Sequence, residues 1–218
     1  MARKKQFLVA GLGMFGSAVA IAFSEMGYNV LGLDADERVT QNLAEQLTSI
    51  ICADASDEKV LRTIAVEDID VAVVAIGSLE KNLVCTMLLK QMGVKKVVAK
   101  ALNELHGRML EKIGADKIVF AEKDMGVPVA HHLVSGSIVD YIELSDDINV
   151  VSVSVPKQYV GKALSDTDLR SVYNVNVIAI RRAGKSIINP RADEVFEAGD
   201  QMVTIGTPEN IKFLGEHF

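Results

Sequence analysis

The chain has 218 residues, 49% of them hydrophobic, and its 23 basic and 29 acidic side chains give a net charge of −6. These values exclude a disordered chain, which has fewer apolar residues and a higher net charge. The acidic balance argues against nucleic-acid binding, which requires clustered Lys and Arg. Cys52 and Cys85 lie in apolar stretches without a second Cys or His at metal-ligand spacing. We therefore expect two buried thiols in a reducing compartment.

The stretch Gln6–Ser24 carries no charge and follows three basic residues, which imitates a signal peptide or a membrane span. Its internal order differs from both, because a β-type run at Gln6–Ala10 is followed by a glycine-rich turn and a helix-forming segment, Ser17–Met26. Glycines weaken a spanning helix but serve a strand-turn-helix unit. We therefore expect a soluble, cytoplasmic chain that does not insert in a membrane.

Short apolar runs alternate with segments of helical period through the first part of the chain. They predict six strands: Gln6–Ala10, Asn29–Leu33, Ser49–Ala53, Val71–Ile76, Lys96–Lys100 and Lys117–Phe120. The spacing leaves room for one helix in each crossover, and uniformly apolar runs are typical of parallel strands covered on both faces. The predicted fold class is α/β, a Rossmann-like doubly wound parallel sheet, in a first domain of residues 1–142.

After Phe120 the pattern changes to a small α+β module, predicted to form a second domain of residues 143–218. A helix capped by Asp124, with Pro128 in its first turn, precedes it, and a Ser/Gly loop and a second turn lead to Leu144. Alternation of apolar and polar residues then predicts antiparallel strands with one solvated face. The predicted elements are strands Val151–Val155, Val175–Ile180, Ser186–Ile188 and Gln201–Ile205, a helix Thr167–Val172 and a last helix from Pro208.

A glycine motif, Gly11-Leu-Gly13-Met-Phe-Gly16, follows the first predicted strand and opens a helix, and Asp34 follows the second strand. In such a unit the first glycine permits the tight turn, the second lets phosphate approach the backbone, and the third lets helix and strand pack. Phosphate then meets the unpaired N–H groups of the helix. Asp34 can bind ribose hydroxyls and disfavours the 2′-phosphate of NADP. The alternative is a relic turn without ligand.

Further candidates lie at the carboxyl ends of the other predicted strands, where such folds form their crevice. Asp54 and Ala55 follow the third strand, where an adenine lodges, and Gly77 follows the fourth. Lys100 ends the fifth strand and can reach a phosphate. Glu122 follows the sixth strand; beside bound phosphates it can hold a divalent cation such as Mg²⁺, and otherwise it is a solvated charge.

Catalytic motifs are missing from the sequence, which has no nucleophile elbow, Walker lysine loop or metalloprotease helix. Its four histidines have no acidic partner at useful spacing. We therefore expect no catalytic residues and no enzyme activity. The alternative is a small NAD-dependent oxidoreductase.

Three segments resemble a known family: Gly11–Gly16, Val71–Gly77 and above all Leu110–Gly126. They are similar to the RCK (regulator of potassium conductance) or KTN subunits of Ktr/Trk potassium-uptake systems, of the KtrA type. The resemblance covers essentially the whole chain. A generic Rossmann enzyme has no reason to carry the last segment.

The resemblance implies a homo-oligomer in which dimers assemble into an octameric ring, peripheral to the inner face of the plasma membrane. Such rings gate an integral-membrane potassium transporter subunit and bind ATP or ADP, and in some relatives NAD or NADH. The glycine loop, including Phe15, would hold the phosphates, and Glu122 would face the terminal phosphate or its cation. A stripe of Met125, Val129, Ala130, Leu133 and Val134 would suit a helix that crosses between subunits, or would pack within its own domain.

Met14 departs from the family pattern, in which this residue is usually an Arg that contacts the γ-phosphate. Methionine cannot supply the bidentate, charge-assisted hydrogen bonds of a guanidinium. The departure makes ADP or a dinucleotide more plausible as the ligand than a distinction between ATP and ADP at this residue.

The second module carries a motif of related domains that bind cyclic di-AMP between two subunits. The corresponding residues are Leu164, Ser165, Asp168, Arg170, Asn176 and Val177. Ser165 interrupts the usual aliphatic pair, whereas the Asp-Arg-Asn spacing is intact. The alternative is that Asp168 and Arg170 form a salt bridge that only stabilises the fold.

Overall fold

The computed structural model describes residues 4–134, 138–145 and 147–218. The chain divides into two compact units, Met1–Asp124 and Met125–Phe218, and each is described by itself. Among the described residues, no helix is both long and apolar enough to cross a membrane.

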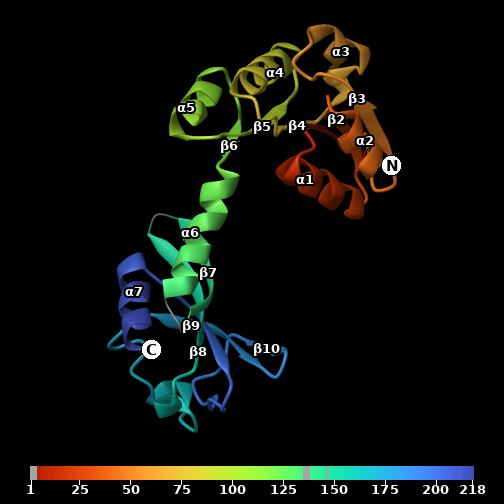
Figure 1. Cartoon of the computed structure of the whole chain (residues 1–218). Helices are drawn as coiled ribbons and strands as arrows, with labels where there is room; N and C mark the ends of the chain where they lie inside the picture. The colour runs from red at the N-terminus through yellow and green to blue at the C-terminus, as the bar shows by residue number, and fades with distance from the viewer. Residues whose placement is uncertain (1–3, 135–137, 146) are drawn as a thin grey trace. The chain divides into compact units, whose positions relative to one another are not determined.

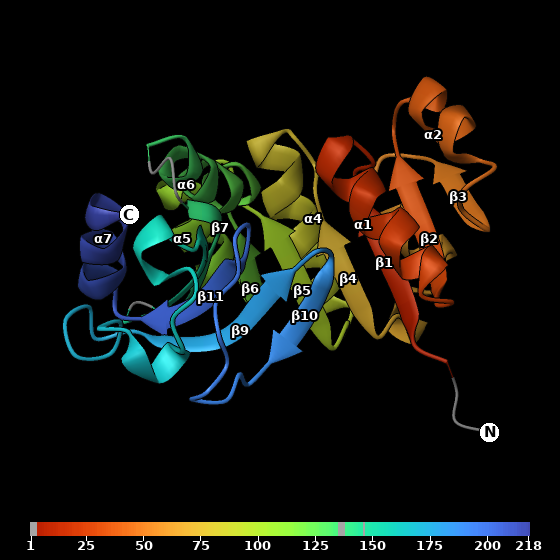
Figure 2. The same ribbon diagram turned by 90° about the horizontal axis from the view of Figure 1, so that it is seen from below.

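The first unit (Figure 1) is a six-stranded parallel sheet in the order β3-β2-β1-β4-β5-β6, whose strands are all labelled in Figure 2. Its strands are β1 (Gln6–Ala10), β2 (Asn29–Asp34), β3 (Ser49–Cys52), β4 (Val71–Val74), β5 (Lys96–Lys100) and β6 (Lys117–Val119). The order reverses direction between β1 and β4, which is the point where such sheets open a crevice at the carboxyl ends of their strands. The predicted doubly wound α/β fold is confirmed.

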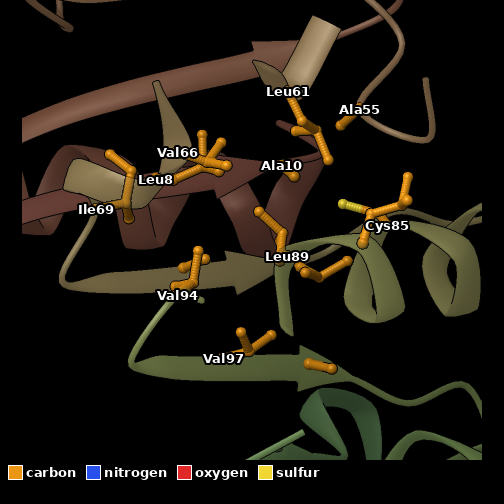
Figure 3. Close-up of a cluster of buried hydrophobic side chains, with 14 of the residues drawn as sticks. Leu8, Ala10, Ala55, Leu61, Val66, Ile69, Cys85, Leu89, Val94 and Val97 are labelled. Carbon is orange, nitrogen blue, oxygen red and sulfur yellow. The ribbon is translucent and has the colours of Figure 1, made fainter. Parts of the chain in front are cut away.

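Helices cover both faces of this sheet. They are α1 (Met14–Glu25), α2 (Glu37–Leu43), α3 (Glu58–Thr63), α4 (Leu79–Gln91) and α5 (Glu104–Lys112), with a 3-10 turn η1 (Val66–Asp68). One apolar cluster joins strands to α1 and α2, and a second joins them to α3, α4 and α5. Figure 3 shows Leu61, Cys85 and Leu89 of the second cluster gathered against the strand residues Leu8 and Ala10.

The second unit contains an antiparallel five-stranded sheet in the order β10-β9-β11-β8-β7. Its strands are β7 (Ile138–Ser145), β8 (Ile148–Ser154), β9 (Asn176–Arg182), β10 (Lys185–Ile188) and β11 (Gln201–Gly206), with 3-10 turns η2 (Lys157–Tyr159) and η3 (Leu164–Asp166). The helix α7 (Pro208–His217) contacts β8 and β11 (Figure 2), and its buried Ile211 and Leu214 belong to the core of this unit. The predicted α+β module is thus confirmed.

Two predictions for the second unit are wrong. The segment Thr167–Val172 is not a helix but a series of turns, with one helix-like bond from the Val172 N–H to the Asp168 carbonyl. The Ser/Gly loop predicted after α6 lies outside the described residues, but the second turn predicted to lead to Leu144 is instead the strand β7. Its pairing with β8 shifts register twice, and each shift interrupts the alternation that would have identified a strand.

The helix α6 (Ala121–Val134) begins earlier than the sequence predicted. Asp124 lies in its first turn rather than capping it, and the carboxylate accepts a hydrogen bond from the Phe120 N–H at 3.2 Å. Position 128 therefore falls inside the helix and not in its first turn, as was predicted. Met125, Val129 and Leu133 are exposed, so packing within the unit does not bury these three positions.

The two cysteines differ, and the expectation of two buried thiols is wrong for Cys52. Cys85 is fully buried in α4, and burial raises the pKa of its thiol to about 12. Cys52 is exposed at the end of β3, because an edge strand leaves one side uncovered.

We expect alkylation to separate the two thiols, because the thiolate is the reactive species and Cys85 is buried and neutral. Native protein treated with iodoacetamide should gain one modification, at Cys52, and denatured protein should gain two. Peptide mass spectrometry locates the label. The variant Cys52→Ser is the control and should stay unlabelled until it unfolds; rapid labelling of Cys85 in native protein would contradict the buried position.

Candidate functional site

A cavity of about 430 Å³ opens at the carboxyl ends of the parallel strands. All the cofactor residues predicted from the sequence line it except Gly16: Gly11, Gly13, Met14, Phe15, Asp34, Asp54, Ala55, Gly77, Lys100 and Glu122. The sequence did not point to the remaining lining residues: Leu33, Ala35, Ala53, Ala75, Ile76 and Lys81. Residues at or just after the carboxyl ends of all six parallel strands thus meet around one space.

Gly11 and Gly16 are required by the fold itself. Gly11 has a φ of +89°, and a Cβ on it would stand 2.8 Å from the Ala75 backbone. A Cβ on Gly16 would stand 1.8 Å from the Gly11 carbonyl oxygen. Both glycines therefore let the start of α1 pass close to β1 and β4, and this packing role explains why Gly16 does not face the cavity.

Gly13 and Gly77 are not explained by packing. Gly13 has a φ of −62°, which any residue can adopt, and a Cβ there would meet no heavy atom of the described residues within 4 Å. A Cβ on Gly77 would likewise meet nothing described within that distance. A side chain at either position would project into space bordering the cavity, so both glycines keep open a place that a ligand can fill.

The N-terminus of α1 is free to bind an anion. Gly13 is its N-cap and, in the part of the chain that the structure describes, no side chain caps the helix. The first turn holds no acidic residue. Unpaired N–H groups and the positive end of the helix dipole therefore face the cavity, as at phosphate sites.

Asp34 fixes the glycine loop and keeps capacity for a ligand. Its Oδ2 accepts the Leu12 N–H at 2.7 Å, and its Oδ1 accepts the Asp36 N–H at 2.9 Å. A carboxylate offers about four acceptor positions, so two remain. These suit the two hydroxyl groups of a ribose.

Asp54 forms an ion pair across the cavity with Lys81 of α4, with Nζ and Oδ2 2.6 Å apart. Its Oδ1 accepts from both the N–H and the hydroxyl of Ser56. Lys81 and Ser56 together lower the pKa of Asp54 to about 2. The carboxylate therefore stays ionised and can only accept hydrogen bonds. Lys81 had no signal in the sequence, since it reaches Asp54 from a different crossover.

Lys100 and Glu122 form a second ion pair at the cavity, with Nζ and Oε1 2.5 Å apart. The Lys100 ammonium also lies 5.9 Å from the centre of the Phe15 ring, in the first turn of α1. The ammonium is therefore beside the uncapped N-terminal end of α1. Among the described residues no three Cys, His, Asp or Glu side chains are grouped as a metal site, so phosphate oxygens would have to complete a cation site at Glu122.

Met14 is 95% exposed at the mouth of the cavity. An uncharged side chain that makes so little contact adds no specific hydrogen bond for a third phosphate. Its position agrees with the departure noted in the sequence.

In the second unit, the predicted cyclic di-AMP residues lie between η3 and the start of β9: Leu164, Ser165, Asp168, Arg170, Asn176 and Val177. Asp168 accepts a short hydrogen bond from the hydroxyl of the buried Tyr159. Arg170 is exposed and, within the described residues, makes no ion pair with Asp168. The alternative of a salt bridge between these two residues is therefore wrong.

The fold and the cavity agree with comparisons with known proteins. The TrkA-N domain family matches residues 7–121 and the TrkA-C domain family matches residues 134–218. The chain is also 37% identical to Ktr system potassium uptake protein C of Bacillus subtilis, over 95% of both chains. The chain belongs to the TrkA-N/TrkA-C family of RCK proteins. This family is regulatory and non-enzymatic, so the oxidoreductase alternative is set aside.

Solved RCK-containing structures share the fold of this RCK chain at low sequence identity. The GsuK channel bound to NAD has a TM-score of 0.55 and 20% identity; the match covers 98% of this chain and 38% of that one. GsuK bound to ADP has a TM-score of 0.53 and 19% identity, over 61% of this chain and 34% of that one. This chain therefore spans well under half of those proteins, and the likeness shows the fold.

The Asp54–Lys81 pair should make the stability of the RCK chain depend on pH. Because the folded pKa of Asp54 lies below its ordinary 3.8, its contribution is complete above pH 3.8 and lost as pH falls towards 2. Asp54→Asn should lower stability by about 1 kcal/mol or less at about pH 6, since the side chain is 38% exposed, and by less at about pH 3.

Thermal melts across this range measure the difference. The control is Glu58→Gln, which removes an exposed ion pair with Arg62 from α3 and should change the melting temperature little at either pH. An Asp54→Asn effect that grows on acidification would contradict the assignment.

Proposed function

We propose that this chain is a nucleotide-sensing regulatory subunit of a Ktr-type potassium-uptake system. The observation that carries the proposal is the relationship over 95% of its length to a Ktr system potassium uptake protein. The cavity adds a place where a ligand can act. Nucleotide binding at the parallel sheet would change the conformation of an assembly of identical chains.

An adenine nucleotide suits the cavity. Its phosphates would lie at the uncapped start of α1 beside Lys100, its ribose at Asp34, and its base near Asp54 and Ala55. The carboxylate of Asp34 disfavours NADP because it would repel a 2′-phosphate. GsuK, which shares the fold, has been solved with NAD and with ADP, and both ligands contain this nucleotide unit.

Among adenine nucleotides, ADP or NAD is favoured over ATP. Met14 offers no charge to a third phosphate, so the positive groups beside the start of α1 are Lys100 and the helix N-terminus itself. A divalent cation such as Mg²⁺ at Glu122 is part of the proposal, with phosphate oxygens as its other ligands.

The second unit is proposed as a separate site for cyclic di-AMP. Asp168 is held by Tyr159, which fixes the loop, and the exposed Arg170 keeps its guanidinium available for a phosphate or a purine edge. Asn176 is exposed at the start of β9 on the same segment. Ser165 in place of an aliphatic residue would weaken apolar contact with a base.

The proposed assembly is a homo-oligomer of dimers, an octameric ring on the cytoplasmic side of a membrane potassium transporter. The exposed apolar residues Met125, Val129 and Leu133 of α6 support contact with a second copy. The transporter subunit is the membrane partner, since the described residues offer no spanning helix.

A thermal-shift panel tests the proposal directly. Purified protein is melted with ADP, ATP, NAD, NADH and cyclic di-AMP, each with and without Mg²⁺. A ligand at a hundredfold its Kd stabilises a protein by about 2.7 kcal/mol, which such a melt detects. Separate shifts with an adenine nucleotide and with cyclic di-AMP would support two sites. No shift with any nucleotide would contradict the proposal.

Substitutions at Gly13 test the proposed phosphate site at the start of α1 without destabilising the fold. Asp is a favourable N-cap, so Gly13→Asp should fold with a melting temperature at least equal to that of the parent. Its carboxylate would occupy the N–H groups and repel phosphate, and ADP affinity should fall at least about 100-fold. Calorimetry measures the affinity. Gly13→Ser caps the helix without charge and should lose less; undiminished binding by Gly13→Asp would discard the site.

Arg170→Ala tests the second site. It should abolish the cyclic di-AMP shift and leave the adenine-nucleotide shift unchanged, because the exposed guanidinium makes no structural ion pair with Asp168. Arg191→Ala is the matched control, since Arg191 is an exposed arginine of the same unit paired only loosely with Asp193 at 3.3 Å. An equal loss of cyclic di-AMP binding in both variants would indicate that the ligand responds to the overall positive charge of the unit rather than to a site at Arg170.

A further inference from the structure

Lys100 lies between the first turn of α1 and the first turn of α6. Its side chain is only 17% exposed, and its ammonium lies against Phe15 of α1 on one side and Glu122 on the other. Glu122 is 71% exposed. The cation is therefore held at the cavity, while its carboxylate partner reaches it from the surface.

Glu122 belongs to the first turn of α6, and ion pairs join this turn to other elements of the first unit. One is Lys100–Glu122, which faces the cavity. Another joins Lys123 to Glu104 at the start of α5, at 2.7 Å. After Asp124 the same helix continues into the second unit. The two pairs are matched in type and position, but only one involves a residue that lines the cavity.

A phosphate bound at the start of α1 would meet an ammonium that is already paired. The Nζ of Lys100 and the Oε1 of Glu122 are 2.5 Å apart, so the carboxylate is already bound to this ammonium when phosphate arrives. Two anions then share one cation and repel each other. The free energy of phosphate binding is reduced by the free energy of breaking the existing pair.

We propose that, where no divalent cation joins it to the phosphates, Glu122 competes with the nucleotide for Lys100: nucleotide phosphate takes Lys100 from Glu122 and so releases the cavity side of the first turn of α6. This inference rests on the proposed nucleotide function and names its regulation. By linkage, a conformation of α6 that draws Glu122 away from Lys100 raises nucleotide affinity by the same factor. The Lys100–Glu122 ion pair thus couples nucleotide binding to the position of α6.

Removal of the competitor should strengthen binding. We expect Glu122→Gln to bind ADP about fivefold more tightly than the parent, which corresponds to the value of a partly exposed ion pair. The matched variant Glu104→Gln removes the other ion pair of the same turn and should stay within about twofold of the parent. Calorimetry is done in EDTA, so that Glu122 acts on phosphate only through Lys100 and not through a divalent cation.

A double-variant cycle separates competition for Lys100 from general charge repulsion. In a Lys100→Gln background, which weakens ADP binding by itself, Glu122→Gln should no longer strengthen it. Hydrogen exchange adds a structural readout: ADP should speed exchange in the peptide covering residues 120–126 of the parent, where the Asp124 amide donates to the Phe120 carbonyl.

The inference is overturned if the parent binds ADP but Glu122→Gln binds equally or more weakly in EDTA. It is also overturned if the gain persists without Lys100, or if ADP slows exchange at the start of α6. A parent that binds no nucleotide overturns the proposed function and this inference together. The two failures are therefore distinguished by the parent alone.

Discussion

The cavity depends on one close backbone approach. The start of α1 lies so near β1 that a Cβ on Gly16 would stand 1.8 Å from the Gly11 carbonyl oxygen, while Gly11 is itself pressed against the Ala75 backbone after β4. The first turn of the helix is thereby fixed where the strand order reverses. Asp34 completes this arrangement, because its hydrogen bond to the Leu12 N–H ties the loop to the end of β2. The remaining side chains of the cavity are placed around this crossing.

The charges around the cavity are already paired among themselves. Asp54 has Lys81, Glu122 has Lys100, and both oxygens of Asp34 accept backbone N–H groups. An entering phosphate would therefore gain most from the N–H groups at the start of α1, which no described side chain caps, and would gain less from a lysine that must give up a carboxylate. The backbone N–H groups are therefore in position before a ligand binds, whereas the charged side chains must exchange one partner for another.

The sequence was sufficient to predict elements that a local pattern of apolar residues and turns encodes. The bounds of β1 and β5 were predicted to the residue, since both are apolar runs closed by turns. It failed for β7, whose register shifts break alternation, and for Thr167–Val172, where Leu169 and Val172 mimic helical spacing inside a set of turns. It also missed the exposure of Cys52, because the sequence alone did not show that β3 is an edge strand.

Within the candidate site, the same distinction separates residues that could be predicted from those that could not. The glycines and Asp34 belong to one strand-turn-helix-strand unit, so their spacing places them together. Lys81 comes from α4 and meets Asp54 from another crossover, and Tyr159 meets Asp168 across a loop. These pairings exist only in the folded chain. The role of Glu122 belongs to this second kind, because its partner Lys100 lies on a different strand.

An exchange of partners at Lys100 sets a limit on what a single site can transmit. The phosphate replaces one ion pair by another, so the free energy available to α6 is the difference between the two pairs, about 1 kcal/mol. Reversal of a population from 1:99 to 99:1 requires about 5.5 kcal/mol. A single chain cannot supply this free energy. Several copies that change conformation together can, because the contributions of their sites add. An ion-pair exchange of this strength therefore requires an oligomer if it is to act as a switch.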